Sequence, residues 1–449
     1  MSIISSSSSS THRLLPHLRF LSSSATSFPD LDTLSVSQAK FKLRYHPNPD
    51  KALAIFSSIF DRLYDPISTR YILDLVVRQL AEAQRFSDIE NLIESHKSHP
   101  KFAQEPFFAT LIHAYGRARM TDRAIQTFRD MDGLATPPRS VISFNALLTA
   151  CYKAQQFNQV TELFSEITKN YEIAPDTASY GILIKSHCES GQPESAISLL
   201  NEMEEKGIEI GTFAYTHILD SLYKKGKVED AEKLWNEMRE KGCSPDVVAY
   251  NVKIMHAAHH QKPKEVLKLI DEMVSAGLKP DTISYNFLIT CYCKNGQMDE
   301  AKKVYMGLQE KGCKPNVATF RTLVHFLCEN GDFDMALEVF NASKKRHKIP
   351  KNKVSDLGNM GNLIRGLVKT SKSEEAKAVL EYVKKRFPES FMNGWKKVEM
   401  ELGLTDEGKG STQAYWGALV THHPQLQNPR THSPKPALLL ISFSSLLKP

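Results

Sequence analysis

The feature that most constrains this chain is a short phrase that returns every 35 residues. Residues 243–251 read CSPDVVAYN, residues 278–286 read LKPDTISYN, and residues 313–321 read CKPNVATFR. A fixed period of 20–50 residues is typical of repeat architectures, in which each repeat is one supersecondary element that cannot bury its apolar face alone. The period therefore predicts a stack of similar repeats.

Phasing the sequence on this phrase divides most of it into repeats. The clear ones are 177–211, 212–246, 247–281 and 282–316. Two of 36 residues precede them at 105–140 and 141–176, and a weaker one covers 70–104. Two degenerate ones follow at 317–356 and 357–391. We expect a repeat solenoid over 70–391, a degenerate N-terminal repeat at 33–69 and a terminal capping helix at 387–404.

Each repeat has the pattern of two helices. In 212–246 the apolar positions of both segments follow the i, i+3, i+4, i+7 spacing of a helix face: Tyr215, Ile218, Leu219 and Leu222, then Ala231, Leu234, Trp235 and Met238. Gly226 and Gly242 follow the two segments at C-cap positions, and Pro245-Asp246 ends one repeat and can cap the next. No sustained alternation favours a strand. The prediction is an all-α, right-handed α-solenoid of about nine helix-turn-helix repeats of 35 residues, with the first helices lining a binding surface.

Composition excludes several classes of protein. The 449 residues carry 57 basic and 51 acidic side chains, a net charge of +6, which permits an anionic partner without requiring one. No apolar run reaches the eighteen or so residues of a membrane span, so no membrane association is expected. The sequence contains no phosphate loop, nucleophile motif or deaminase signature, so we expect no enzyme and no cofactor.

The cysteines and histidines do not indicate a metal site. Cys188, Cys293 and Cys328 share one phase of the repeat and Cys243 and Cys313 share another, which indicates small packing residues. We predict that all seven cysteines are reduced. Histidines 256, 259 and 260 have the spacing of one helix face but no acidic or cysteine partner nearby, so no metal is expected.

The two ends of the sequence differ from the repeats. Residues 1–29 contain eleven serines, two arginines and no acidic residue, the profile of an organellar transit peptide. Arg19-Phe20-Leu21-Ser22 is similar to mitochondrial processing sites, so we predict the mitochondrion, with the plastid as the alternative. Residues 405–449 are rich in Pro, Ser, Thr and His and are expected to form a disordered tail.

The recurring letters resemble a known family. Val-Val-x-Tyr-Asn, then Gly-x-x-x-x-Ala, then Met-x-x-x-Gly-x-x-Pro-Asp are similar to the pentatricopeptide repeat of plant organellar RNA-binding proteins, and 282–316 is close to its consensus. The absence of a deaminase motif makes the chain similar to the plain P-class. The related tetratricopeptide repeat has 34 residues and a Trp-x-x-Leu-Gly-x-x-Tyr opening that this sequence lacks.

This resemblance implies a single-stranded RNA ligand read at one base per repeat. In the family, the fifth and last residues of a repeat contact one base edge and the second residue packs on the base. The implied reading pairs are Asn145 with Asp176, Thr216 with Asp246, Asn251 with Asp281, and Asn286 with Asn316. The implied stacking residues are Ile142, Phe213, Val248 and Ile283. These pairs predict a U-x-G-U-C core.

The same residues also fit simpler roles. The acidic members of the pairs can be helix N-caps, which stabilise a helix by about 1 kcal/mol each. Lys153, Lys224 and Lys294 share one phase and are candidate phosphate contacts, but ordinary solubilising lysines would look the same. Some repeats depart from the pattern, with Gly181 and Gly211 in one and Arg321 at the fifth position of another. These departures predict modest sequence specificity.

The resemblance thus implies a monomeric, non-enzymatic protein of the mitochondrion that binds single-stranded RNA and acts on transcript stability, processing or translation. An architectural subunit of the mitochondrial ribosome is the alternative. A tetratricopeptide-like scaffold that binds protein helices is a third class. The sequence does not name a transcript.

Overall fold

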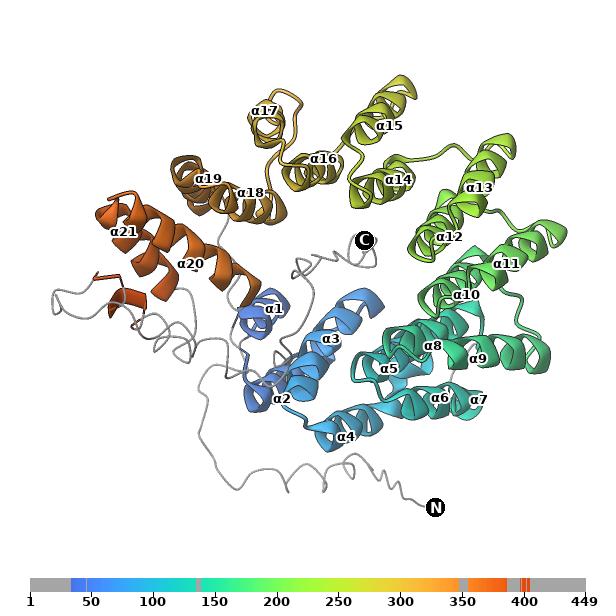
Figure 1. Cartoon of the computed structure of the whole chain (residues 1–449). Helices are drawn as coiled ribbons and strands as arrows, with labels where there is room; N and C mark the ends of the chain where they lie inside the picture. The colour runs from blue at the N-terminus through green and yellow to red at the C-terminus, as the bar shows by residue number, and fades with distance from the viewer. Residues whose placement is uncertain are drawn as a thin grey trace, which may run out of the picture. The chain divides into compact units, whose positions relative to one another are not determined.

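The computed structural model of the chain describes part of the sequence, which divides into two compact units. The described residues are 34–45, 47–134, 139–346, 354–385, 396, 398–400 and 402–403. The N-terminal unit comprises residues 1–190 and the C-terminal unit residues 191–449. Within the described ranges every regular element is a helix and none is a strand (Figure 1). The predicted transit peptide and C-terminal tail lie outside these ranges, as does most of the predicted capping helix at 387–404.

The N-terminal unit contains ten α-helices and two short 3-10 turns in the described residues. The helices are α1 (Val36–Tyr45), α2 (Pro49–Ile59), α3 (Pro66–Glu82), α4 (Phe86–Lys97), α5 (Glu105–Arg117), α6 (Thr121–Arg129), α7 (Met131–Leu134), α8 (Val141–Lys153), α9 (Phe157–Asn170) and α10 (Thr177–Glu189). The 3-10 turns are Phe60–Arg62 and Pro100–Ala103.

The C-terminal unit continues with the same helical pattern. Its helices are α11 (Pro193–Glu205), α12 (Thr212–Lys224), α13 (Val228–Glu240), α14 (Val247–His259), α15 (Pro263–Ser275), α16 (Thr282–Lys294), α17 (Met298–Gly307), α18 (Val317–Glu329), α19 (Phe333–Arg346), α20 (Val354–Lys369) and α21 (Ser373–Lys384).

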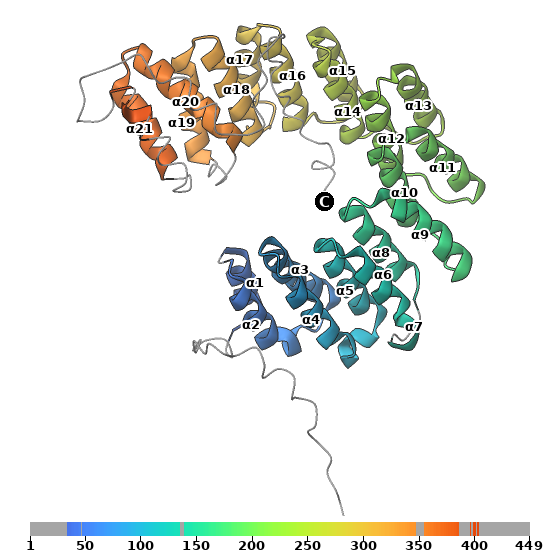
Figure 2. The same cartoon turned by 60° about the horizontal axis from the view of Figure 1, so that its bottom comes forward.

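Helices pack within a repeat and between neighbouring repeats. In the C-terminal unit α12 packs on α13 and also on α14, the first helix of the next repeat, and α14 packs in the same way on α15 and α16. In the N-terminal unit α3, α5 and α8 lie side by side in this order (Figure 2). Each repeat therefore covers the apolar face of its neighbour, which confirms the predicted α-solenoid.

The predicted apolar faces form the core. Tyr215, Ile218, Leu219 and Leu222 of α12 are buried, and so are Ala231, Leu234, Trp235 and Met238 of α13. Tyr115, Tyr180 and Tyr215 come from the first helices of three repeats and are among the largest fully buried side chains. All seven cysteines are free in the structure. Burial raises the pKa of Cys151 and of Cys293 to about 12, which suits packing residues and not nucleophiles.

Most first helices begin where the repeated phrase predicts, but two begin earlier. Helix α3 begins at Pro66 and α20 at Val354, ahead of the repeat boundaries expected at 70 and 357. The start of α3 is fixed by Asp65, whose side chain accepts a hydrogen bond from the Ser68 amide, followed by Pro66 at the first helical position. The domain limits as a whole stay predictions.

From α3 onward, each first helix is followed, two residues after its last helical residue, by a residue with a positive φ, which is left-handed backbone geometry. Glycine occupies this place in four repeats, at 191, 226, 296 and 331, with φ between 71° and 77°. Five other repeats place a larger residue there with φ between 55° and 66°, namely Gln84, Arg119, Gln155, Gln261 and Ser371. An L-residue with a side chain reaches this conformation only at a cost in free energy, so these five ends are strained. In the described part of the chain no helix is both long and apolar enough to cross a membrane.

Candidate nucleic-acid interface

The predicted reading pair of the repeat 141–176 is held together by hydrogen bonds. Asn145 donates from Nδ2 to Oδ1 of Asp176 over 3.0 Å. The hydroxyl of Ser179, in the following repeat, donates to Oδ1 of Asn145 over 2.6 Å. Asp176 also caps α10, since its carboxylate accepts the Ser179 amide at 2.8 Å. The three side chains form what we call a polar triad, which joins one repeat to the next.

Two more polar triads recur in the C-terminal unit. Asn251 donates to Asp281 over 3.2 Å and accepts a 2.7 Å hydrogen bond from the hydroxyl of Ser284. The third triad consists of Asn286, Asn316 and Thr319: Asn286 donates to Asn316 over 3.2 Å and accepts from the Thr319 hydroxyl over 2.6 Å. The last residue of each reading pair is thus both an N-cap and a partner of the fifth residue. The capping role and the pairing role that the sequence left open therefore coexist.

The fourth predicted pair is not joined in this way. Thr216 donates its hydroxyl to the carbonyl of Thr212, one turn back in its own helix, over 2.8 Å. Asp246 caps α14 by accepting the Ala249 amide over 2.8 Å. Ala249 stands where the triads carry Ser179, Ser284 or Thr319, and it has no hydroxyl to donate. The absence of this hydroxyl explains why Thr216 and Asp246 form no triad.

Burial separates the four fifth-position residues into two classes. Asn251 is 3% exposed and Thr216 is 1% exposed. Asn145 and Asn286 are half-buried. The predicted stacking residues are more open: Ile142 is 50% and Phe213 43% exposed, and Val248 and Ile283 are half-buried. A ligand would therefore meet the apolar second positions before the polar fifth positions.

The hydrogen bonds of the triad keep Asp176 ionised. Partial burial alone would raise the pKa of this carboxyl, but the hydrogen bonds from Ser179 and from Asn145 outweigh it and hold the pKa below its ordinary value. At neutral pH the carboxylate keeps an acceptor oxygen beyond those it uses in the triad. Base edges carry amide and amino donors, so such an oxygen is a suitable partner for them.

The three candidate phosphate contacts all lie at the last residue of a first helix. Lys153 ends α8, Lys224 ends α12 and Lys294 ends α16. Lys224 is paired with Asp220 over 2.7 Å, so part of its charge is already compensated. Lys153 is exposed and lines a groove in the N-terminal unit. Their assignment as phosphate contacts stays a prediction.

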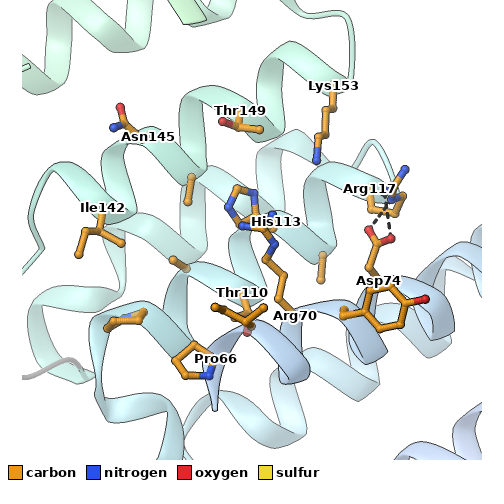
Figure 3. Close-up of a pocket in the computed structure, with 16 residues that line it drawn as sticks. Pro66, Arg70, Asp74, Thr110, His113, Arg117, Ile142, Asn145, Thr149 and Lys153 are labelled. Carbon is orange, nitrogen blue, oxygen red and sulfur yellow. Dashed lines mark hydrogen bonds and ion pairs between the residues drawn. The ribbon is translucent and has the colours of Figure 1, made fainter. Parts of the chain in front are cut away.

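That groove is formed by the first helices α3, α5 and α8. Its volume is about 830 Å³, and its lining includes Arg70, His113, Ile142, Asn145 and Lys153 (Figure 3). The groove thus combines a predicted reading residue, a predicted stacking residue and a predicted phosphate contact with two side chains that sequence reasoning missed.

The described residues contain no group of three or more His, Cys, Asp or Glu side chains placed to hold a metal ion. His256 instead stacks on the ring of Tyr223, with 4.3 Å between ring centroids. Burial lowers the pKa of both His256 and His259.

Family models match the repeats that form this surface. A model described as the PPR repeat family matches residues 139–189, 175–213, 210–254, 245–291 and 280–329. A second, described as the PPR repeat, matches 107–134 and 318–347. Together these ranges cover more than half of the chain. The chain belongs to the pentatricopeptide repeat family.

This pentatricopeptide repeat protein has similar relatives in Arabidopsis thaliana. The protein named small ribosomal subunit protein mL103 (rPPR7) is 51% identical over 390 residues, which span 86% of this chain and 93% of the relative. A pentatricopeptide repeat-containing protein named as mitochondrial is 50% identical over 200 residues, 44% of this chain and 47% of the relative. These relatives confirm the predicted mitochondrial location. Among solved structures, the pentatricopeptide repeat protein PPR10 from maize aligns with a TM-score of 0.41 at 19% identity, over 81% of this chain and 60% of that chain.

The early start of α3 reveals pentatricopeptide repeat positions that the sequence phasing missed. Asp65 is the N-cap of α3, as Asp176 is of α10, so Ile67 stands at the second position of its helix and Arg70 at the fifth. Ile67 is 83% exposed, in line with the open second positions of the other repeats. The signal that could have found them is the dipeptide Asp65-Pro66, a helix start with a capping residue followed by proline at the first position.

Proposed function

We propose that this protein binds single-stranded RNA in the mitochondrion along the face that carries the second and fifth residues of its first helices. The observation that carries the proposal is the recurrence of one arrangement. Three repeats join an asparagine at the fifth position to an Asp or Asn at the last position, over 3.0–3.2 Å, beside a partly exposed apolar residue at the second position. Membership in the pentatricopeptide repeat family supports RNA as the ligand.

The chemistry of each arrangement suits one base. The asparagine uses one Nδ2 hydrogen on its partner and one lone pair on Ser or Thr, which leaves a second N–H for a ligand. The neighbouring carboxylate of Asp176 or Asp281 offers an acceptor, so together they present a donor beside an acceptor. An apolar side chain such as Ile142 can cover the face of the same base, and stacking is favourable for any base.

The proposal includes the reading order U-x-G-U-C, taken from the pairs 145/176, 216/246, 251/281 and 286/316. Because Thr216 and Asn251 are buried, we expect these two repeats to contribute less to discrimination than Asn145 and Asn286. The test is a binding titration of the full-length protein with a fluorescent oligonucleotide that contains U-x-G-U-C and with its complement. Severalfold tighter binding of the first supports base reading, and equal affinity rejects it.

A second candidate is an architectural subunit of the mitochondrial ribosome, favoured by one observation. The relative named as small ribosomal subunit protein mL103 is 51% identical and is covered almost along its whole length. In a ribosome the same face would hold folded RNA mainly by shape and charge. This mode of binding does not require the predicted reading residues to contact base edges, so their burial would not weaken it. Sedimentation of mitochondrial extracts in high salt separates the candidates: a stoichiometric component stays with the ribosomal subunit, and a transcript-specific factor stays free.

We further propose that the protein is not an enzyme and needs no cofactor. Buried, protonated thiols and side chains committed to triads and caps suit a binding role. A purified sample that cleaves a bound transcript with a dependence on one of its own side chains would reject this part of the proposal.

A further inference from the structure

The groove on α3, α5 and α8 contains two arginines, Arg70 and Arg117, whose pairing differs. Arg70 is exposed and makes no ion pair or hydrogen bond within the described part of the chain. Arg117, at the same groove, is instead paired with Asp74, with 2.9 Å between Nη2 and Oδ2. The groove therefore has one compensated guanidinium and one that is open to an anion.

Lys153 brings a second cation to the same place from a different helix. The pKa of His113 is lowered to about 3, mainly because the imidazole is buried. The positive charges of Arg70 and Lys153 lower this pKa further, so both cations act on the same imidazole. Figure 3 shows Arg70 extending toward His113 and Lys153 pointing into the groove from the opposite side. Among the described residues, the buried Nδ1 of His113 has no hydrogen-bond partner. Two cations from α3 and α8 thus converge beside this imidazole of α5, which favours a negatively charged group between them.

The walls of the groove are apolar at its outer edge. Ile67 of α3 and Ile142 of α8 are 83% and 50% exposed, and both line the groove. Thr110 and Thr149 add hydroxyl groups to its lining (Figure 3). A ligand with an anionic part and a flat apolar part would satisfy both sets of side chains. A nucleotide has this combination.

We propose that this groove holds one nucleotide of single-stranded RNA, with its phosphodiester between Arg70 and Lys153 and its base against Ile142. The inference rests on the proposed RNA-binding function and deepens it. Arg70 occupies the fifth position of its helix, where the four predicted reading repeats carry the neutral residues Asn145, Thr216, Asn251 and Asn286, so this repeat contributes charge and no base discrimination. The groove anchors the strand independently of sequence.

The surface next to the groove continues the same chemistry. Tyr71 lines the groove, and the cations of Lys40 and Arg44 lie over its ring at 5.7 Å and 5.6 Å. Helix α1 also exposes Phe41 and Tyr45, each 58% accessible, with 4.7 Å between ring centroids. Exposed rings between basic side chains are the surface on which single strands stack. This part of the chain, before residue 107, lies outside the ranges matched by the family models.

The test compares the salt dependence of RNA binding between variants of the full-length protein. Arg70→Gln and Lys153→Gln are titrated with a fluorescent oligouridylate and an oligoadenylate at several salt concentrations. Each lost phosphate contact should lower the slope of log K against log salt by about 0.7 and weaken binding severalfold at low salt, equally for both oligonucleotides. Arg129→Gln is the matched control, because this arginine lies on a second helix of the same unit and pairs with Glu166 over 3.2 Å. It should keep the wild-type slope.

The outcomes separate this inference from the proposed function. If the wild type binds RNA and both groove variants keep its slope, the inference is overturned and the proposed function stands. If the wild type binds no RNA, both the inference and the proposed function are rejected. If polyglutamate binds as tightly as RNA and only the groove variants lose it, the groove takes acidic peptides and the inference is wrong. Circular dichroism of each variant checks that these exposed substitutions leave the helices folded.

Discussion

Nδ2 of Asn251 lies 3.2 Å from Oδ1 of Asp281, while the hydroxyl of Ser284 donates to Oδ1 of the same asparagine over 2.7 Å. The two predicted base-reading residues of one repeat are therefore fixed by a side chain of the next. The arrangement couples the stability of the repeat interface to the geometry that is offered to a base.

Replacing Ser284 with alanine should destabilise the C-terminal unit. The buried amide oxygen of Asn251 would lose its donor, and an unsatisfied buried acceptor costs about 1–3 kcal/mol. Urea unfolding followed by circular dichroism would show a lower midpoint. Ser198→Ala is the control, because Ser198 is exposed and its hydroxyl only bonds the carbonyl of Glu194. Equal midpoints for the two variants would contradict the structural role of the triad.

Replacing Asn251 with threonine should change base preference at a single position of a bound RNA. If the pair 251/281 contacts a base, the variant should favour guanine over uracil there, as predicted for the pair 216/246, and leave the other positions unaltered. Competition binding with oligonucleotides that differ at one base measures this. Because Asn251 is 3% exposed, we expect a smaller change than for Asn286→Thr, whose fifth position is half-buried. An unchanged preference in both variants would reject base reading in this region.

Gln261→Gly should stabilise the protein, although it removes a side chain. Gln261 has φ 55°, where an L-residue is strained by about 1–2 kcal/mol, more than the roughly 0.5–1 kcal/mol that glycine loses in conformational entropy on folding. A gain of about 0.5 kcal/mol is expected. The matched control is Gln126→Gly, inside helix α6, where the backbone is helical, glycine brings only the entropic loss and the thermal midpoint should fall. A fall in the midpoint of the Gln261 variant would contradict the predicted strain.

His113 should make the N-terminal unit less stable in mild acid. Its folded pKa of about 3 lies below the ordinary value of 6.5, so between these values the unfolded chain binds a proton that the folded chain does not. Stability from this group is therefore lost as the pH falls from about 7 toward 3, by about 1–2 kcal/mol at pH 5. The measurement compares unfolding midpoints of wild type and His113→Gln at pH 7.5 and 5.

The wild-type midpoint should fall more than that of the His113 variant over this interval. Equal falls of the two unfolding midpoints between pH 7.5 and 5 would mean that the imidazole is protonated in the folded state. Arg70→Gln should reduce the effect in part, because one of the two nearby positive charges is then gone.

Much of this architecture follows from local sequence. The 35-residue period, the apolar spacing within 212–246 and the Pro-Asp phrases predict where most helices begin, end and bury a face. This works because a helix face and a helix cap are decided by residues within a few turns of one another. The same reasoning missed the start of α3 at Pro66, where the repeat is degenerate and only Asp65-Pro66 indicates the boundary.

The tertiary structure alone decided which polar side chains are accessible and which ones meet. Asn145 and Asn251 occupy the same place in the repeated phrase, yet one is half-buried and the other 3% exposed, because neighbouring repeats cover them differently. Arg70, His113 and Lys153 have no shared spacing in the sequence. They converge because α3, α5 and α8 pack side by side. The electrostatic potential of these side chains depends on distances between helices, and the repeat period of the sequence does not give those distances.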